Sequence, residues 1–464
     1  VEENRVFITK QHQEEEDTAS MIARKLHEQI PVLTIEKELE EAQEDLNITL
    51  SEQQKEAVRM VFANPISIIT GGPGTGKTTV LKIILYIYQK KCGNEVKLMA
   101  PTGRAARRMA ESTGSGDATT MHMALGLFGD GDYEALIDEL SADFVNVDEV
   151  SMVDMHLAYE FFYKVKAGAR VLLVGDVHQL PSVGAGDVFR QLILCGKIPV
   201  TVLNLVYRQG KDSNIPINAQ LINEGKTNLQ WGDDFQMVEC SGADAAAQIV
   251  KNIYLKEIQM YGMEQVQILS PYKVRSAAGV LELNRSLQDE VNPPVSGKRE
   301  LHLGGEIFRE GDRILQNKNT EFASNGDLGT LVQIAEDEDN NPLVQIVFTD
   351  GRRVKYEAEQ VEMIEHANAI TIHKSQGSEC QVVIIPWLKA FYPMLKRNIF
   401  YTGITRAKQR VYIVGEWKAV CQAIHTDDTG TRKTMLAVKI QQYCERYQPQ
   451  SNRQIPTTIC NRAV

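Results

Sequence analysis

The fold is decided by Gly71-Gly72-Pro73-Gly74-Thr75-Gly76-Lys77-Thr78, which follows the apolar run Ile66–Thr70 and leads into a helix that we expect to begin at Thr79. A glycine-rich turn of this pattern between a strand and a helix is a P-loop. Its glycines let backbone N–H groups approach phosphates, and the helix N-terminus favours negative charge. We expect Lys77 to reach the β- and γ-phosphates of ATP and the Thr78 hydroxyl to bind Mg²⁺. The nucleotide-binding residues predicted here are Gly72, Pro73, Gly74, Thr75, Gly76, Lys77, Thr78 and Thr79.

Two further apolar runs end in side chains that ATP hydrolysis needs. Phe144–Val147 leads into Asp148 and Glu149. We expect Asp148 to serve Mg²⁺, usually through water, and Glu149 to orient or deprotonate the attacking water. A later run ends in Gly175-Asp176-Val177-His178-Gln179-Leu180-Pro181, where Gln179 is placed to sense the γ-phosphate. In isolation such carboxylates are often merely solvated and such an amide merely stabilises a turn, but the P-loop upstream favours catalytic roles.

The chain alternates between strand-like and helical segments in two regions. From about 48 to 205, and again from about 215, short β-forming runs are separated by helical stretches, which indicates parallel sheets with active residues at the strand C-termini. Between about 301 and 361, glycines and charges punctuate short β-like runs, which is typical of a small antiparallel barrel. Residues 1–46 show helical spacing. The sequence therefore predicts an α/β protein with more than one domain.

Composition excludes several classes of protein. With 43% hydrophobic and 24% charged residues the chain is typical of soluble globular proteins, and no stretch approaches the length of a membrane span. Seven scattered cysteines lack metal-site or redox spacing and suit a reducing cytoplasm. The net charge of −11 neither supports nor excludes a nucleic-acid partner, because attraction to phosphates is local. Since the first residue is Val, we expect a fragment of a longer protein.

Three later motifs make the pattern recognisable. Together with the P-loop, Asp148–Met152 and Gly175–Pro181 elements, they resemble superfamily 1 helicases, and specifically the RecD-like branch, superfamily 1B. The motifs are Tyr207-Arg208-Gln209, Thr371-Ile372-His373-Lys374-Ser375-Gln376-Gly377-Ser378-Glu379 and Tyr401-Thr402-Gly403-Ile404-Thr405-Arg406-Ala407-Lys408. The resemblance, which spans about 48–440, implies two RecA-like P-loop domains with ATP in the cleft between them.

The resemblance also assigns roles around the nucleotide. Leu50-Ser51-Glu52-Gln53-Gln54 is similar to the family's Q-motif, in which Gln54 would read the adenine edge. Arg208 and Arg406 match the two arginines that the second domain presents to the γ-phosphate. Without that match, each would more often be a surface salt-bridge arginine. Glu379 would contact the ribose or couple the nucleotide site to DNA.

The family organisation divides the chain into four parts. Residues 1–46 form a helical N-terminal segment, and 47–209 the first RecA-like domain with a short strand-separating pin near 126–136. Residues 210–300 and 362–464 form the second RecA-like domain. Residues 301–361 form an SH3-like barrel inserted into it, as a module that embraces DNA or, alternatively, as a simple stabilising insertion.

The strand-binding residues also come from the resemblance, with one group on each RecA-like domain. Arg104 has structural contacts as its alternative, and lone histidines such as His122 and His373 are usually structural. The predicted DNA-binding residues are Pro101, Thr102, Gly103, Arg104, Thr120 and His122 in the first domain, and Thr371, His373, Lys374, Ser375 and Gln376 in the second.

These patterns predict an ATP- and Mg²⁺-dependent DNA helicase that moves 5′ to 3′ on single strands. Its expected partners are single-stranded DNA and single-strand–duplex junctions, and we expect a cytoplasmic monomer with no membrane partner. The short, acidic interval at 126–133 motivates an alternative, a translocase or nucleoprotein remodeller without unwinding. A third alternative, a nucleic-acid-binding scaffold subunit of a repair complex, is disfavoured because it would not need Lys77, Glu149, Arg208 and Arg406 together.

Overall fold

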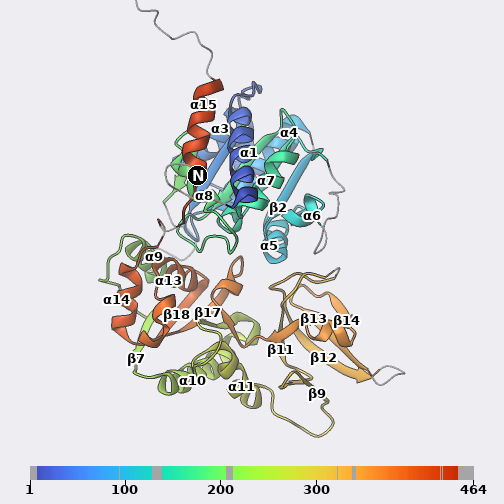
Figure 1. Cartoon of the computed structure of the whole chain (residues 1–464), viewed down its shortest axis with the longest axis vertical. Coiled ribbons are helices and arrows are strands. Elements are labelled where there is room, and N and C mark those ends of the chain that lie inside the picture. The colour runs from blue at the N-terminus through green and yellow to red at the C-terminus, as the bar shows by residue number, and fades with distance from the viewer. Residues whose placement is uncertain are drawn as a thin grey trace, which may run out of the picture.

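The computed structural model describes residues 8–93, 95–127, 138–204, 213–320, 322–336, 341–428, 430 and 432–447. Two parallel sheets lie one above the other, each covered by helices, and an antiparallel β-structure projects beside the second sheet (Figure 1). This is the predicted arrangement of two RecA-like domains with an SH3-like insertion in the second.

The first parallel sheet has six strands in the order β3-β2-β4-β5-β1-β6. Every residue of β1, β4 and β5 is buried, because helices cover both faces, and this explains their nearly continuous apolar sequences. The strands are β1 (Ile66–Gly71), β2 (Val96–Ala100), β3 (Thr119–Thr120), β4 (Phe144–Val147), β5 (Arg170–Gly175) and β6 (Val200–Leu203). The helices are α3 (Glu52–Ala63), α4 (Lys77–Cys92), α5 (Gly103–Thr113), α6 (Met121–Ala124), η1 (Val150–Met152), α7 (Met155–Lys164) and α8 (Val188–Leu194).

Both ends of the described chain pack on this first domain. Figure 1 shows α1 (Thr9–Leu26) beside α15 (Leu436–Tyr447), and the carboxylate of Glu15 accepts hydrogen bonds from Thr434 Oγ1 at 2.6 Å and Met435 N at 3.0 Å. Helix α2 (Glu36–Asp45) buries Leu39 and Ala42 in the same domain. The N-terminal helices are therefore part of the first domain, and the last helix differs from the predicted grouping of 362–464 with the second domain.

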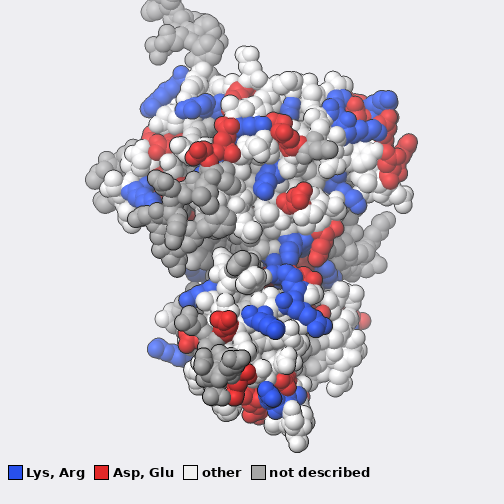
Figure 2. Space-filling view, turned by 90° about the vertical axis from the view of Figure 1, so that its right-hand side faces the viewer, with Lys and Arg blue, Asp and Glu red and all other residues white. Residues whose placement is uncertain are grey.

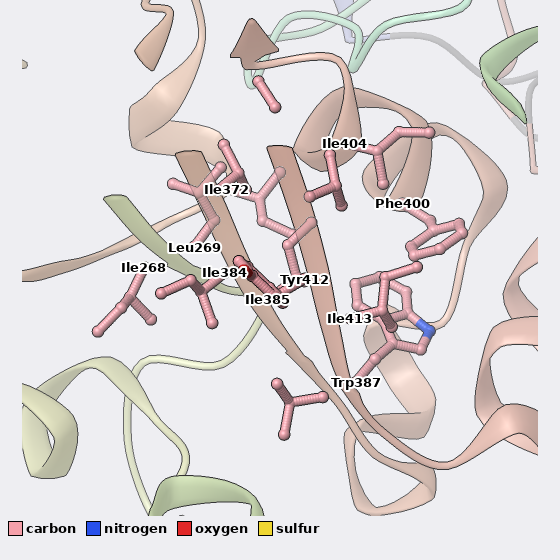
Figure 3. Close-up of a cluster of buried hydrophobic side chains, with 14 of the residues drawn as sticks. Ile268, Leu269, Ile372, Ile384, Ile385, Trp387, Phe400, Ile404, Tyr412 and Ile413 are labelled. Atoms are coloured by element: carbon pink, nitrogen blue, oxygen red, sulfur yellow. The ribbon is translucent and has the colours of Figure 1, made fainter. Parts of the chain in front are cut away.

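The second parallel sheet has five strands in the order β16-β8-β17-β18-β7. Its core is built around Trp387 and Phe400, which lie against isoleucines of the central strands (Figure 3). The strands are β7 (Phe235–Glu239), β8 (Val266–Ser270), β16 (Ala369–Thr371), β17 (Cys380–Trp387) and β18 (Ala407–Gly415). The helices are α9 (Asn214–Asn223), α10 (Ala243–Tyr261), η2 (Met263–Gln265), α11 (Val280–Val291), η3 (His373–Ser375), η4 (Lys389–Met394), α13 (Arg397–Ile404) and α14 (Trp417–His425).

The insertion is antiparallel and has its own small hydrophobic core. A hairpin of β9 (Glu300–Leu303) and β10 (Glu306–Arg309) precedes a five-stranded sheet in the order β14-β13-β12-β11-β15. That sheet reaches past the predicted boundary at residue 361, because β15 pairs with β11. Its elements are β11 (Arg313–Gln316), β12 (Leu328–Glu336), β13 (Pro342–Phe348), β14 (Arg353–Tyr356), α12 (Ala358–Val361) and β15 (Ile364–His366).

One local prediction differs from the structure, and another falls on residues that the structure does not describe. The helix after the P-loop begins at Lys77 and not at Thr79, because Gly76 adopts a left-handed conformation (φ +85°) that already turns the chain into the helix. The predicted pin near 126–136 falls almost wholly within 128–137, outside the described residues.

Across the described ranges, no helix combines the length and apolar character that crossing a bilayer requires.

Candidate nucleotide and nucleic-acid site

A cavity of about 890 Å³ lies where the first domain, the second domain and the insertion meet. The P-loop opens into it from the first domain, and residues of the Thr371–Glu379 and Tyr401–Lys408 motifs enter from the second. Most of the residues predicted to bind nucleotide therefore line one cavity. The sequence alone did not show that the two domains would meet there. Those lining it are Pro73, Gly74, Gly76, Lys77, Thr78, Thr79, Asp148, Glu149, Gln179, Glu379 and Arg406.

The P-loop owes its shape to glycine at defined positions. Gly74 and Gly76 have φ of +75° and +85°, which side chains rarely tolerate. A Cβ on Gly71 would lie 2.7 Å from the Leu203 carbonyl oxygen, so β1 can end only in glycine here. Lys77 Nζ donates to the carbonyl oxygens of Gly71 at 2.6 Å and Gly72 at 2.9 Å. The ammonium is thus held over the loop whose N–H groups would bind phosphate.

Gln54 supports the P-loop through a hydrogen bond to its backbone. It completes a capping box with Ser51 at the start of α3, and its Nε2 donates to the carbonyl of Thr75 at 3.3 Å. The side chain is 4% exposed and is not among the residues that line the cavity. In this structure Gln54 acts as a brace for the P-loop, and its reading of adenine stays a prediction.

The two acidic residues follow β4 as expected. Asp148 Oδ1 accepts a hydrogen bond from the Glu149 backbone N–H at 2.8 Å, and Glu149 has a φ of +53°, an uncommon conformation for a glutamate. Burial and the neighbouring charge of Glu149 raise the pKa of Asp148 above its usual range. A cation beside Asp148 would reverse that effect, because it favours the charged carboxylate.

The residues present fit a magnesium ion held together with phosphates. Thr78 and Asp148 both line the cavity and offer the oxygen ligands that Mg²⁺ prefers. No group of three or more His, Cys, Asp or Glu that could hold a metal occurs within the described part of the chain. Mg²⁺ commonly takes only one or two protein ligands and completes its shell with phosphate oxygens and water.

Gln179 and Arg406 approach the cavity from different domains. Gln179 is 7% exposed, and its Nε2 donates to Asp176 Oδ2 at 3.3 Å, while its Oε1 has no hydrogen-bond partner among the described residues. Arg406 is 3% exposed and donates from Nε to the Thr402 carbonyl at 3.1 Å and from Nη1 to the Ser378 carbonyl at 3.3 Å. The second predicted arginine, Arg208, lies outside the described residues.

Glu379 joins the two domains through charge. Its carboxylate accepts from Arg108 Nη2 on α5 at 2.6 Å and lies 3.5 Å from Lys408 Nζ on β18. The predicted ribose contact is untested, but the ion pair makes Glu379 a bridge across the cleft. Arg108 was not among the predicted site residues, since its only signal in the sequence was membership of the arginine-rich helix after Gly103.

The predicted strand-binding group of the first domain lies against the insertion. Gly103 packs so closely on Ser324 that an added Cβ would clash with that side chain, and Arg104 Nη2 donates to the Gly326 carbonyl at 2.6 Å. Burial lowers the pKa of Arg104 to about 10. Thr102 caps α5 by accepting from Ala105 N at 3.3 Å. Arg104 thus makes the structural contact foreseen as its alternative.

The remaining members of that group differ in exposure. Pro101 and Thr102 are partly exposed between β2 and α5. Thr120 caps α6 by accepting from Met123 N at 3.2 Å, and His122, one residue into the helix, is exposed. The His122 side chain is therefore accessible to a ligand, although burial of part of the ring lowers its pKa.

The predicted strand-binding group of the second domain is partly engaged within the protein. Lys374 Nζ lies 2.9 Å from Glu365 Oε2, and Thr371 Oγ1 accepts from the Lys374 N–H at 3.2 Å. Ser375 is 1% exposed and donates to the Ile372 carbonyl at 2.7 Å. Gln376 Nε2 donates across the cleft to the Leu180 carbonyl at 2.9 Å.

His373 is half-buried next to these residues, and burial lowers its pKa, so the neutral imidazole is favoured at pH 7. On the face that carries α5 and the insertion, Lys and Arg side chains gather at the level where the two domains meet, interspersed with a few carboxylates (Figure 2). Strand contacts by Thr371, His373, Lys374, Ser375 and Gln376 stay predictions.

Three family models match the chain. An AAA domain matches residues 49–243, a UvrD-like helicase C-terminal domain matches 366–414, and the ATP-dependent RecD-like DNA helicase SH3 domain matches 283–348. The last match covers most of the insertion described above. Between them, the three models follow the order of the first domain, the insertion and the second domain.

Curated relatives agree with these matches. The chain is 35% identical over 370 residues to the ATP-dependent RecD2 DNA helicase of Deinococcus radiodurans, covering 80% of this chain and 50% of that protein. It is 27% identical to the RecBCD enzyme subunit RecD of Haemophilus influenzae, covering 82% of this chain and 72% of that one. The chain thus spans about half the length of the first relative.

Among solved structures, the Pif1 helicase of Candida albicans shares 19% identity with a TM-score of 0.49, over 79% of this chain and 94% of that one. The ordered motifs, the insertion and the relatives in sequence together lead to one assignment. In sequence, the chain is similar to the RecD-like DNA helicases over about 80% of its length.

Proposed function

We propose that the chain is an ATP-driven DNA helicase that moves 5′ to 3′ along single strands and separates duplex at junctions. One observation carries the proposal: side chains suited to hydrolysis line a single cavity from both domains, with Lys77 and Glu149 on one side and Arg406 on the other. A site divided in this way changes shape when the domains move, so hydrolysis can drive relative motion.

The hydrolytic roles follow from the chemistry of each group. P-loop N–H groups and Lys77 bind the phosphates, and Glu149 accepts a proton from the attacking water. Arg406 neutralises the negative charge that develops during phosphoryl transfer, a role in which Arg208 would be its partner. Thr78 and Asp148 would hold Mg²⁺, which when bound supplies further charge neutralisation on the phosphates.

The strand roles rest on the family. DNA is the proposed track, in keeping with the Deinococcus radiodurans relative, which is a DNA helicase, and the single-stranded form comes from the family resemblance. Thr102 and His122 in the first domain and Thr371, His373 and Lys374 in the second are the proposed grips. The 5′ to 3′ polarity, action on junctions and a monomeric state belong to the same proposal.

The decisive experiment is steady-state ATP hydrolysis with and without single-stranded DNA, at low salt with Mg²⁺, on the chain and on Lys77→Ala. We expect stimulation by DNA and a loss of turnover of at least about 100-fold in the variant, because a phosphate-binding charge is removed. Lys90→Ala is the matched control, since Lys90 is an exposed residue near the end of the same helix. Turnover in Lys77→Ala equal to that of the unmodified chain would overturn the site.

Strand separation needs its own measurement. We expect the chain to displace a labelled strand from a duplex with a 5′ single-stranded tail and to leave a duplex with a 3′ tail intact. Displacement of a bound protein from single-stranded DNA without duplex separation would favour the translocase alternative. ATP hydrolysis that ignores DNA would remove the motor proposal while leaving the ATPase.

A further inference from the structure

One residue of the first domain is held at both of its main-chain polar groups by the second domain. The Leu180 N–H donates to Thr402 Oγ1 at 2.9 Å, and the Leu180 carbonyl accepts from Gln376 Nε2 at 2.9 Å. Leu180 follows Gln179 directly, and it is only 4% exposed. Two side chains from separate motifs of the second domain therefore fix the main chain beside Gln179.

A second contact fixes the Gln179 side chain through Asp176. Tyr401 Oη donates to Asp176 Oδ2 at 2.8 Å, and the same carboxylate oxygen accepts from Gln179 Nε2 at 3.3 Å. Asp176 Oδ1 accepts from the His178 N–H at 3.0 Å. Asp176 and Tyr401 are each 1% exposed. The carboxylate thus orients the Gln179 amide on one side and is itself held by the tyrosine on the other.

Tyr401 also reaches the P-loop. A Cβ built on Gly72 would lie 3.2 Å from the Tyr401 hydroxyl, so phosphate loop and tyrosine are nearly in contact. Burial and the charge of Asp176 raise the pKa of Tyr401 well above its usual range, so the hydroxyl keeps its proton and remains a donor.

The hydrogen bonds made by Tyr401, Thr402 and Gln376 exist only while the domains are apposed. Tyr401, Thr402 and Gln376 all belong to the second domain, whereas Asp176, Gln179 and Leu180 belong to the first. Within the first domain, the main chain of this turn bonds to Asp176 through the N–H groups of His178 at 3.0 Å and Gln179 at 3.2 Å. Its bond to β1, from the Val177 N–H to Thr70 Oγ1, is longer at 3.4 Å. Opening the cleft would take Tyr401 away from Asp176, and Thr402 and Gln376 away from Leu180. The Asp176–Gln179 hydrogen bond would then lose the groups that hold it in place.

We propose that Tyr401 and Thr402 are positioning residues that orient the Gln179 amide toward the reacting phosphate only when the cleft is closed. The inference rests on the proposed function and deepens it, because it names how hydrolysis senses closure. Gln179 lines the cavity, and its buried amide oxygen has no partner among the described residues, so as an acceptor it suits the attacking water. Gln376 adds a link to the strand-binding motif in which it lies.

The test measures nucleotide affinity and needs no turnover. Binding of Mg·ADP and of Mg·ADP with aluminium fluoride, a mimic of the transferring phosphate, is determined on the full chain by competition with a fluorescent ADP analogue. We expect Tyr401→Phe, which removes only a hydroxyl, to weaken binding of the aluminium fluoride complex about tenfold, the effect of one lost hydrogen bond to a charged group. Affinity for Mg·ADP should stay within about twofold of the unmodified chain, since Gln179 acts on the third phosphate position.

A double-mutant comparison separates positioning from a general structural role. In a Gln179→Ala background, Tyr401→Phe should cause no further loss, because the group that it positions is absent. Equal losses with and without Gln179, or an equal loss of Mg·ADP affinity, would overturn the inference. Tyr412→Phe is the control, since this buried tyrosine of β18 donates to Glu257 at 2.9 Å, and neither residue lines the cavity.

A second pair of variants guards against misfolding of Tyr401→Phe. Thr402→Val keeps the shape but leaves the Leu180 N–H without its acceptor, whereas Thr402→Ser keeps the hydroxyl. We expect the valine variant to lose affinity for the aluminium fluoride complex and the serine variant to retain it. Identical behaviour of the two would refute the role of Thr402. A chain that shows these binding patterns but no ATP hydrolysis would refute the proposed function alone.

Discussion

The residues predicted to bind ATP and those predicted to bind a DNA strand have different surroundings in the folded chain. Most members of the first group line one cavity, among them Lys77, Glu149, Gln179 and Arg406. Members of the second group hold one another and the rest of the protein, as when Arg104 binds the Gly326 carbonyl. Most of the predicted nucleotide residues therefore line one cavity, whereas several strand-binding candidates make contacts within the protein and their contact with DNA stays a prediction.

The difference has a physical cause. Phosphate binding by a P-loop depends on backbone N–H groups within one turn, so its geometry is local and recurs wherever the pattern occurs. Contacts to a DNA strand are made by side chains spread over a surface. Each of these side chains can instead form a hydrogen bond or ion pair within the protein. Arginine is especially prone to this, because its planar guanidinium has five N–H donors that can bind both carbonyl and carboxylate oxygens.

The largest expected effect would break the ATP side of the comparison. Glu149→Gln should reduce ATP turnover by about 10²- to 10⁴-fold, because the amide cannot take the proton of the attacking water. Mg·ATP affinity should change little, which is measured by equilibrium binding beside the steady-state rate. Asp143→Asn, at the exposed opposite end of β4, is the control. Turnover near that of the unmodified chain would mean that Glu149 is not the base.

An intermediate effect would sharpen the strand side. Lys374→Ala should weaken binding of single-stranded DNA about fivefold near 0.1 M salt and lower the slope of log affinity against log salt by about 0.7, as expected for one phosphate contact. Fluorescence anisotropy over a salt series measures both, and Lys418→Ala, exposed on α14, is the control. An unchanged slope would show that the ammonium serves only Glu365 and its neighbours.

The smallest effect concerns the contact between α5 and the insertion. Arg107 pairs with Asp327 and, at 3.2 Å, with Asp350, while Asp327 keeps a second partner in Arg352 at 2.8 Å. Arg107→Gln should therefore lower the free energy of unfolding by only about 1 kcal/mol.

That difference should shrink at high salt, because partly exposed ion pairs are screened. Chemical denaturation at low and high salt measures it, with Arg353→Gln on the exposed edge of the insertion as control. A loss that does not respond to salt would mean that Arg107 acts through packing.

Much of the fold could be read from the sequence. The runs Phe144–Val147, Val266–Ser270 and Arg313–Gln316 are strands with the predicted ends. They succeed because each is a short apolar run bounded by turn-forming or polar residues. The last helix is the exception, because the amphipathic pattern of α15 shows that it has a buried face and not which domain buries it.

The sequence by itself predicted the nucleotide site, since glycines, Lys77 and Thr78 stand at P-loop spacing, and Asp148–Glu149 follow a strand that ends at the same edge of the sheet. Only the tertiary structure decided what joins the domains. Tyr401 and Thr402 stood in a recognised motif, yet their bonds to Asp176 and Leu180 span more than two hundred positions of sequence. Such contacts leave no local pattern in the sequence. They depend on which buried polar groups the fold brings together across the cleft, and not on spacing along the chain.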